Sequence, residues 1–170
     1  MKNQPIINRV ANSALVSIDL EDLYQPGPRL GIDLAQWLLE GIVLREKDFR
    51  KAVNSQDWKK YQGAYVYLYC STDAILPGWA YMFVSLQLGD FAKKVVVGDE
   101  FTLENTLFTE AVRDFDASIY QDKPVIIKGC AKREIPPNAY VLLAQKLQVY
   151  AKSIMYGEAC SAVPMFKRQK

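Results

Sequence analysis

The sequence predicts an α/β protein with a mostly parallel sheet, and two observations carry that prediction. Residues 42–100 and 101–159 align without a gap, with 15 identical residues among 59 aligned pairs. In each segment a helical pattern, a short apolar run, an apolar helix and a second strand-like run follow in that order. Strand, crossover helix and strand form a βαβ unit with parallel strands. We therefore expect two tandem βαβ repeats in three layers, preceded by an N-terminal strand and helix extension.

The first repeat begins with an amphipathic helix. Its apolar residues recur at helical spacing between charged neighbours, at Leu44, Phe49, Ala52 and Val53. The run "AYVYLYC" (64–70) has the length and aromatic content of a strand. Pro77 suits the first turn of a helix over "WAYMFVSLQLGDFAKK", which is apolar around most of its circumference and should be buried. "VVVGD" (95–99) closes the repeat as a second strand.

The second repeat has the same order of elements. Its first helix carries Leu103, Leu107, Phe108, Ala111 and Val112 at helical spacing. "PVIIKGC" (124–130) and "IMYGE" (154–158) read as strands on either side of a helix over "NAYVLLAQKLQVYAKS". Two tandem crossovers predict one sheet in the spatial order 2-1-3-4, with the first and third strands adjacent. Ligands of such sheets bind beyond the carboxyl ends of the strands, where the crossovers diverge.

Residues 1–41 lie outside the repeats. "ALVSIDL" alternates like an edge strand, "YQPGPRLG" is typical of a turn, and "DLAQWLLEGI" predicts a short helix with Asp33 as its N-cap. A chain of 170 residues that is 50% hydrophobic has enough apolar material for one core. We therefore expect a single domain over 1–170, with a solvated C-terminal tail from 160 to 170.

Composition and charge exclude several classes of function. The net charge is +2, and the basic cluster "KRQK" stands alone at the C-terminus, so we expect no nucleic-acid partner. No apolar run approaches the roughly 18 residues that a membrane span needs, and the N-terminus lacks the pattern of a secretory signal. We expect a cytoplasmic protein with no membrane partner, and nothing in the sequence indicates its oligomeric state.

The three cysteines are the main indication of function. An odd number of cysteines argues for reduced thiols. Cys70 and Cys130 end the first and third predicted strands, and Cys160 follows the fourth, so the three thiols should share one edge if the "GEACSAVP" loop folds back. Asp73 follows Cys70 at the spacing of a C-x-x-C knuckle, with Asp99 and Glu158 as rival fourth ligands. Soft thiolates favour zinc or an iron–sulfur species, which predicts a metal site.

Two alternatives stay open. Free cysteines are among the most buried residues, so the thiols could be structural in a non-enzymatic protein-interaction module. A thiol-dependent transferase or hydrolase would use Cys70, whose pKa the following helix would lower, with Asp73 or Glu158 for proton transfer. The chain contains no histidine, the commonest general base, and we therefore favour a protein that is not an enzyme.

Four motifs also suggest a family. "LREKDFR", "CSTDAILPGWAYM", "KGC…IPPNAY" and "AKSIMYGEACSAVP" resemble an uncharacterised bacterial family, domain of unknown function 2480, over almost the whole chain. The resemblance implies cysteines at the positions of Cys70, Cys130 and Cys160. It also implies an accessory role in iron–sulfur or sulfur metabolism, with iron–sulfur assembly proteins as partners.

Overall fold

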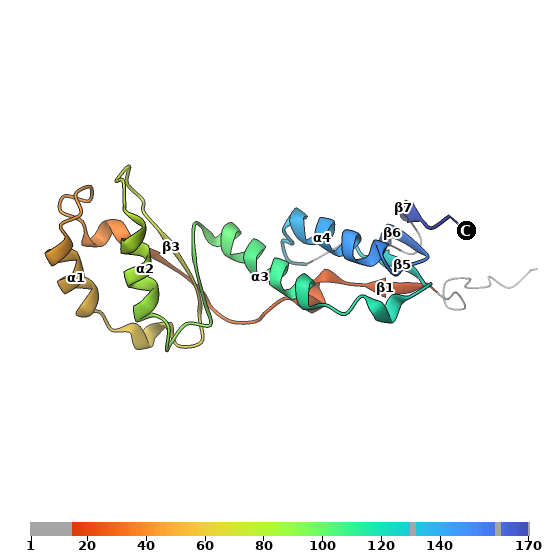
Figure 1. The fold of residues 1–170 in the computed structure, drawn as a ribbon, viewed down its shortest axis with the longest axis horizontal. Coiled ribbons are helices and arrows are strands. Elements are labelled where there is room, and N and C mark those ends of the chain that lie inside the picture. The colour runs from red at the N-terminus through yellow and green to blue at the C-terminus, as the bar shows by residue number, and fades with distance from the viewer. Residues whose placement is uncertain (1–14, 130–131, 159–160, 170) are drawn as a thin grey trace, which may run out of the picture. The chain divides into compact units, whose positions relative to one another are not determined.

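The computed structural model describes residues 15–129, 132–158 and 161–169. They form an α/β protein with mostly parallel sheets, as predicted (Figure 1). The chain divides into two compact units. The middle unit comprises Gln25–Thr106, and the terminal unit comprises the residues up to Tyr24 and those from Leu107 onward. Helix α3 (Glu100–Asp114) begins in the middle unit and ends in the terminal unit.

The middle unit contains a three-stranded parallel sheet. Its strands lie in the order β2 (Arg29–Asp33), β3 (Tyr65–Tyr69), β4 (Lys94–Val97). Its other elements are the 3-10 helices η2 (Leu34–Trp37) and η3 (Trp58–Tyr61) and the α-helices α1 (Glu46–Asn54) and α2 (Gly78–Gln87). The predicted strands and helices of residues 42–100 are therefore present in their predicted order.

Aromatic residues fill the core of the middle unit. Phe49 of α1 is fully buried and contacts the rings of Trp37 and Trp79 edge to face, with ring centroids 5.9 and 5.7 Å apart. Val66 and Leu68 of β3 are also fully buried, facing these helices from the central strand. The core of the middle unit is therefore packed against β3, the strand that ends at Tyr69.

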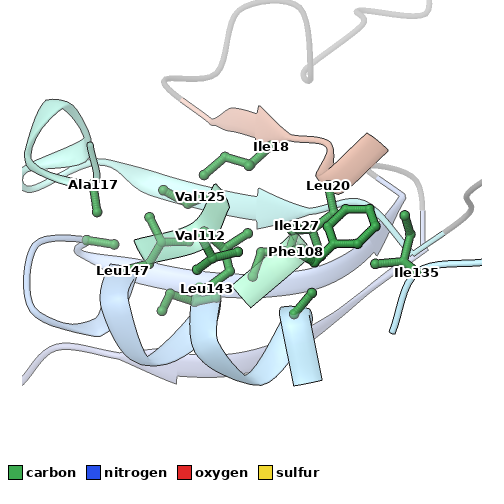
Figure 2. Close-up of a cluster of buried hydrophobic side chains, with 13 residues drawn as sticks. Ile18, Leu20, Phe108, Val112, Ala117, Val125, Ile127, Ile135, Leu143 and Leu147 are labelled. Carbon is green, nitrogen blue, oxygen red and sulfur yellow. The ribbon is translucent and has the colours of Figure 1, made fainter. Parts of the chain in front are cut away.

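The terminal unit contains a four-stranded mixed sheet. Its strands lie in the order β1 (Val16–Ile18), β5 (Pro124–Ile127), β6 (Ser153–Glu158), β7 (Ser161–Lys167), and only β7 is antiparallel to its neighbour. Its helices are η1 (Leu20–Leu23), η4 (Ser118–Tyr120), α4 (Pro137–Gln148) and the end of α3. Figure 2 shows its core, where Phe108 and Leu143 lie against Val125 and Ile127 of β5.

The elements of the two units correspond at the predicted offset. Tyr65 begins β3 and Pro124 begins β5, 59 residues later (124 − 65). The strand registers agree as well, because Val66 pairs with Val95 as Val125 pairs with Ile154. Buried positions follow the same offset, as in Phe49 and Phe108, Ala80 and Ala139, and Leu88 and Leu147.

The prediction of one sheet in the order 2-1-3-4 is wrong. β3 lies between β2 and β4, and β5 lies between β1 and β6, so the first and third predicted strands belong to separate sheets. The reason lies in residues 1–41, which supply one outer strand to each sheet: β1 ends within "SIDL" (17–20) and β2 within "GIDL" (31–34). β2 pairs with the edge of β3, and β1 with the edge of β5, that the predicted order used to pair these two strands with each other. The single domain over 1–170 stays a prediction.

Two smaller predictions also need correction. The predicted turn "YQPGPRLG" ends early, because β2 begins at Arg29, and the short helix after Asp33 is the 3-10 helix η2, for which Asp33 is the N-cap as predicted. Residues 161–167 of the predicted tail form β7, a strand with a bulge between Ile154 and Met155 of its partner. β7 pairs with β6, whereas residues 159–160 of the loop that was expected to fold back lie outside the described residues.

Candidate functional site

The carboxyl edge of the middle sheet is held together by Asp33. This residue ends β2, and its carboxylate accepts hydrogen bonds from the backbone N–H of Ala35 (2.9 Å) and of Ser71 (3.0 Å). The Ser71 hydroxyl donates to the second carboxylate oxygen at 2.5 Å. Burial would raise the pKa of Asp33, but the bonds from Ser71 and Ala35 outweigh it and lower the pKa from 3.8. Asp33 therefore stays ionised and anchors the segment after β3.

Cys70 lies in this segment, directly after β3 as predicted. Its side chain is half-buried against the apolar core, and Sγ lies 3.3 Å from Oγ1 of Thr72. The Thr72 hydroxyl has one hydrogen, which it donates to the carbonyl of Gly41 at 2.6 Å. The Cys70 thiol must therefore be the donor to Thr72, a role that requires its proton. This geometry fits a neutral, structural thiol.

The other acidic residues predicted at this edge, Asp73 and Asp99, make no contact with Cys70 in the hydrogen bonds described for them. Asp73 is exposed in the bend after Cys70. Asp99 accepts hydrogen bonds from the N–H and the hydroxyl of Thr102, which lower its pKa and begin α3. Among residues 15–129, 132–158 and 161–169, no group of three or more cysteine, aspartate or glutamate side chains is arranged to hold a metal ion. Cys130 and Cys160 lie outside the described residues.

The carboxyl edge of the terminal sheet carries an ion pair. Asp19 follows β1, accepts a hydrogen bond from the N–H of Glu21 and lies 3.0 Å from Nζ of Lys128. Burial raises the pKa of Asp19, yet the bonds from Glu21 and Lys128 bring it below 3.8. The bond to Asp19 in turn raises the pKa of Lys128, and Glu158 at the end of β6 adds to that shift. At this edge the Lys128 ammonium is therefore paired with the Asp19 carboxylate and also interacts electrostatically with Glu158.

The sequence predicted Asp33 as an N-cap, but the role of Asp19 and its correspondence with Asp33 were missed. Asp19 and Asp33 occupy the same place in their units, since each follows a buried isoleucine, precedes a buried leucine and caps a 3-10 helix. The matching tetrapeptides "SIDL" (17–20) and "GIDL" (31–34) were the available signal. They stand 14 residues apart (31 − 17), a spacing that differs from the 59-residue offset of the aligned segments.

Each unit also has an open apolar groove beside its second helix. The terminal groove, about 560 Å³, lies among α4, β6 and β7, and the middle groove, about 350 Å³, lies between α2 and β4. Every residue that lines the middle groove has a counterpart 59 positions later in the terminal groove, for example Tyr81 and Tyr140, Met82 and Val141, Val97 and Tyr156. The terminal groove has additional lining residues, among them Val163 and Met165 of β7.

None of the helices in the described ranges is long and apolar enough to cross a membrane.

Comparison with known proteins identifies the family and adds no activity. No curated protein and no solved structure matches the chain. A protein family described as "Protein of unknown function (DUF2480)" matches residues 4–168, nearly the entire sequence. The chain belongs to the DUF2480 family.

Proposed function

We propose that the chain binds zinc or an iron–sulfur species through thiolates of the terminal unit, as a cytoplasmic accessory protein of iron–sulfur or sulfur metabolism. One observation supports this most. β5 and β6 are adjacent and parallel, so their carboxyl ends meet at one edge of the sheet. Cys130 follows the end of β5 by three residues (130 − 127), and Cys160 follows the end of β6 by two (160 − 158). This pair replaces the predicted pairing of Cys70 with Cys130.

The surrounding charges suit such a site. Lys128 stands two residues before Cys130 and carries a positive charge at neutral pH, as lysine ordinarily does. A nearby cation favours the thiolate that a soft metal needs. Glu158 is a carboxylate at the same strand ends and would serve as an oxygen ligand. We narrow the predicted set of Cys70, Cys130, Cys160 and Asp73 to the two later cysteines, since Cys70 uses its thiol proton toward Thr72.

Metal content tests the proposal. Protein purified without chelator, and after anaerobic addition of iron and sulfide, should contain about one metal site per chain. A Cys130→Ser, Cys160→Ser chain should lose it. Cys70→Ser is the matched control, since it removes a thiol at the end of a strand in the other unit and should keep the metal. Absence of metal from the wild-type protein under both conditions would refute the proposal.

A protein-interaction module is the second candidate, and the two matched grooves favour it. Both are open and apolar, and exposed apolar residues such as Met82 and Val141 line them at corresponding positions. We infer that residues 42–100 and 101–159 are repeats that each retained this surface. On this reading the thiols are dispensable for binding: a chain with all three cysteines changed to serine would fold and associate as the wild type does.

A further inference from the structure

The outer edges of β4 and β6 differ although the strands correspond. β4 and β6 hold the same register against β3 and β5, 59 residues apart. β7 pairs with the outer edge of β6, whereas β4 ends the order β2-β3-β4 and no described strand covers its outer edge. An uncovered edge presents backbone N–H and C=O groups that another strand can pair with. Within residues 15–129, 132–158 and 161–169, the middle unit thus has no counterpart of β7.

The side chains beside this edge indicate which residues a strand that paired with β4 should present to the middle groove. β7 contributes Val163 and Met165, two residues apart, to the terminal groove. No described strand forms this wall in the middle groove, where Met82 and Val97 are 65% and 54% exposed. Leu86, on the same helix as Met82, is 75% exposed. A strand with apolar residues at positions i and i+2 on the groove side would cover them. β4 itself has this pattern, because Val95 packs toward the core and Val97 lies on the same face.

The charges around β4 make it complementary to a second copy of itself. The strand runs within "KKVVVGDE", with Lys93 and Lys94 at its start and Asp99 and Glu100 just after its end. Antiparallel pairing of two copies brings the lysines of each beside the carboxylates of the other, at both ends. A parallel arrangement would place like charges together. The sequence of the edge therefore favours an antiparallel partner.

We propose that β4 pairs antiparallel with β4 of a second copy about a two-fold axis through Val96, so that two three-stranded sheets join into one. The N–H of Gly98 donates to Leu68 across the β3 ladder, so strand alternation directs the N–H groups of Val95 and Val97 to the outer edge. These two residues hydrogen-bond across the axis, Val95 to the partner's Val97. Val96 faces its own copy as a non-hydrogen-bonded pair, and Lys93 faces the partner's Asp99.

The pairing also covers the exposed part of α2. A two-fold axis perpendicular to the sheet keeps both helices on one face, so Met82 and Leu86 of each copy approach the other. Val95 and Val97 of the partner then stand where β7 places Val163 and Met165 in the terminal unit. The inference is independent of the metal proposal, since it uses no cysteine.

Sedimentation velocity on the full chain tests the dimer. The wild type should associate into a dimer that weakens as salt rises, because its end contacts are ion pairs. Val97→Lys should raise the dissociation constant at least about tenfold, since it places a charge in the closed edge. Val141→Lys, an exposed position in the terminal groove, is the matched control and should leave the constant unchanged. A wild-type monomer at all concentrations, or a dimer that Val97→Lys does not weaken, overturns the proposal.

Cross-linking tests the register. The non-hydrogen-bonded pair at Val96 sets the Cα atoms about 4.5 Å apart, within the range of a disulfide at roughly 4.4–6.8 Å. Val96→Cys should form a linked dimer with oxidised glutathione at least about ten times faster than Val97→Cys, which faces Val95 of the partner. Both chains keep the native cysteines, so the difference reports the new thiol alone. Equal rates in the two chains would overturn the register. Metal content, measured on the same samples, judges the thiolate proposal separately.

Discussion

The middle and terminal units build the same carboxyl edge with different partners. In both, an isoleucine and then an aspartate stand at the end of the first strand, and the aspartate caps a 3-10 helix. Asp33 receives its further hydrogen bonds from Ser71, a neutral partner, whereas Asp19 receives one from the lysine Lys128. The neutral arrangement fixes the loop that carries Cys70. In the terminal unit, Lys128, Asp19 and Glu158 place charged groups at the sheet edge. Such groups are better suited to binding a ligand than to anchoring a loop.

The largest expected effect is on stability, and it tests whether the cores of the two units unfold independently. Phe49→Ala should lower the free energy of unfolding by about 3–5 kcal/mol, since it removes a fully buried ring. All three tryptophans, Trp37, Trp58 and Trp79, lie in the middle unit, so their fluorescence reports its unfolding. Phe108→Ala is the corresponding change in the terminal unit. It should leave the tryptophan transition in place, because the two buried clusters share no residue.

An equal shift of the tryptophan transition in both variants would contradict this expectation. It would show that the units unfold together, as the single domain predicted from composition requires. Circular dichroism on the same samples follows both units and serves as the control.

The next effect compares two glycines at the ends of corresponding strands. Gly98 and Gly157 have φ of +138° and +119°, which side chains rarely adopt. A Cβ at Gly157 would lie 2.6 Å from the backbone oxygen of Ser161, whereas at Gly98 it would meet the side chain of Thr102 at 2.7 Å. Gly157→Ala should therefore cost about 2–3 kcal/mol. Gly98→Ala should cost about as much, because Cβ of Thr102 would lie 2.8 Å from the new Cβ and rotation of the Thr102 side chain does not move that atom. Chemical denaturation measures both, and a negligible cost at either glycine would contradict this account.

A smaller effect concerns the aspartates and pH. The pKa values of Asp33 and Asp19 are lower in the folded chain than their ordinary value of 3.8. Their stabilisation is therefore present above that value and is lost as the pH falls through the lowered pKa. Asp33→Asn should cost about 1 kcal/mol at neutral pH and flatten the loss of stability in acid. Thermal unfolding between neutral pH and pH 3 measures this, and an unchanged acid limb would refute the role of Asp33.

The smallest expected effect distinguishes Ser71, the partner of Asp33, from Lys128, the partner of Asp19. Lys128→Met removes an ion pair at the surface, so its small destabilisation should vanish in high salt. Ser71→Ala removes a neutral donor, and its effect should be the same at all salt concentrations. Denaturation at two ionic strengths separates them. A salt-dependent Ser71→Ala would show that the two edges do not differ as described.

Local patterns predicted most of the elements, because periodicity depends only on nearby residues. The helices around Phe49, Ala80 and Ala139 and the strands at Tyr65 and Pro124 fell where apolar spacing and proline placed them. The partners of the strands could not be predicted in this way. The offset of 59 shows that two segments are alike, but sheet membership depends on β1 and β2, which lie before residue 42.

The strand order behind the predicted site was wrong for the same reason. The order 2-1-3-4 placed the strands that precede Cys70 and Cys130 side by side, whereas β3 and β5 belong to separate sheets. β2 was hidden because Arg29 follows a Pro-Gly-Pro turn, and β7 because its residues lie beyond 101–159. Asp19 and Asp33 lie before residue 42, so the comparison of 42–100 with 101–159 gave no information about them.

The central claim is that the thiols of the terminal unit, and not Cys70, bind the metal. X-ray absorption at the edge of the bound metal counts the sulfur ligands from the protein directly. We predict that Cys70→Ser leaves the sulfur contribution of the wild type unchanged and that Cys130→Ser or Cys160→Ser reduces it. A spectrum that loses sulfur when Cys70 is replaced, or that has no cysteine sulfur in the wild type, would contradict the claim.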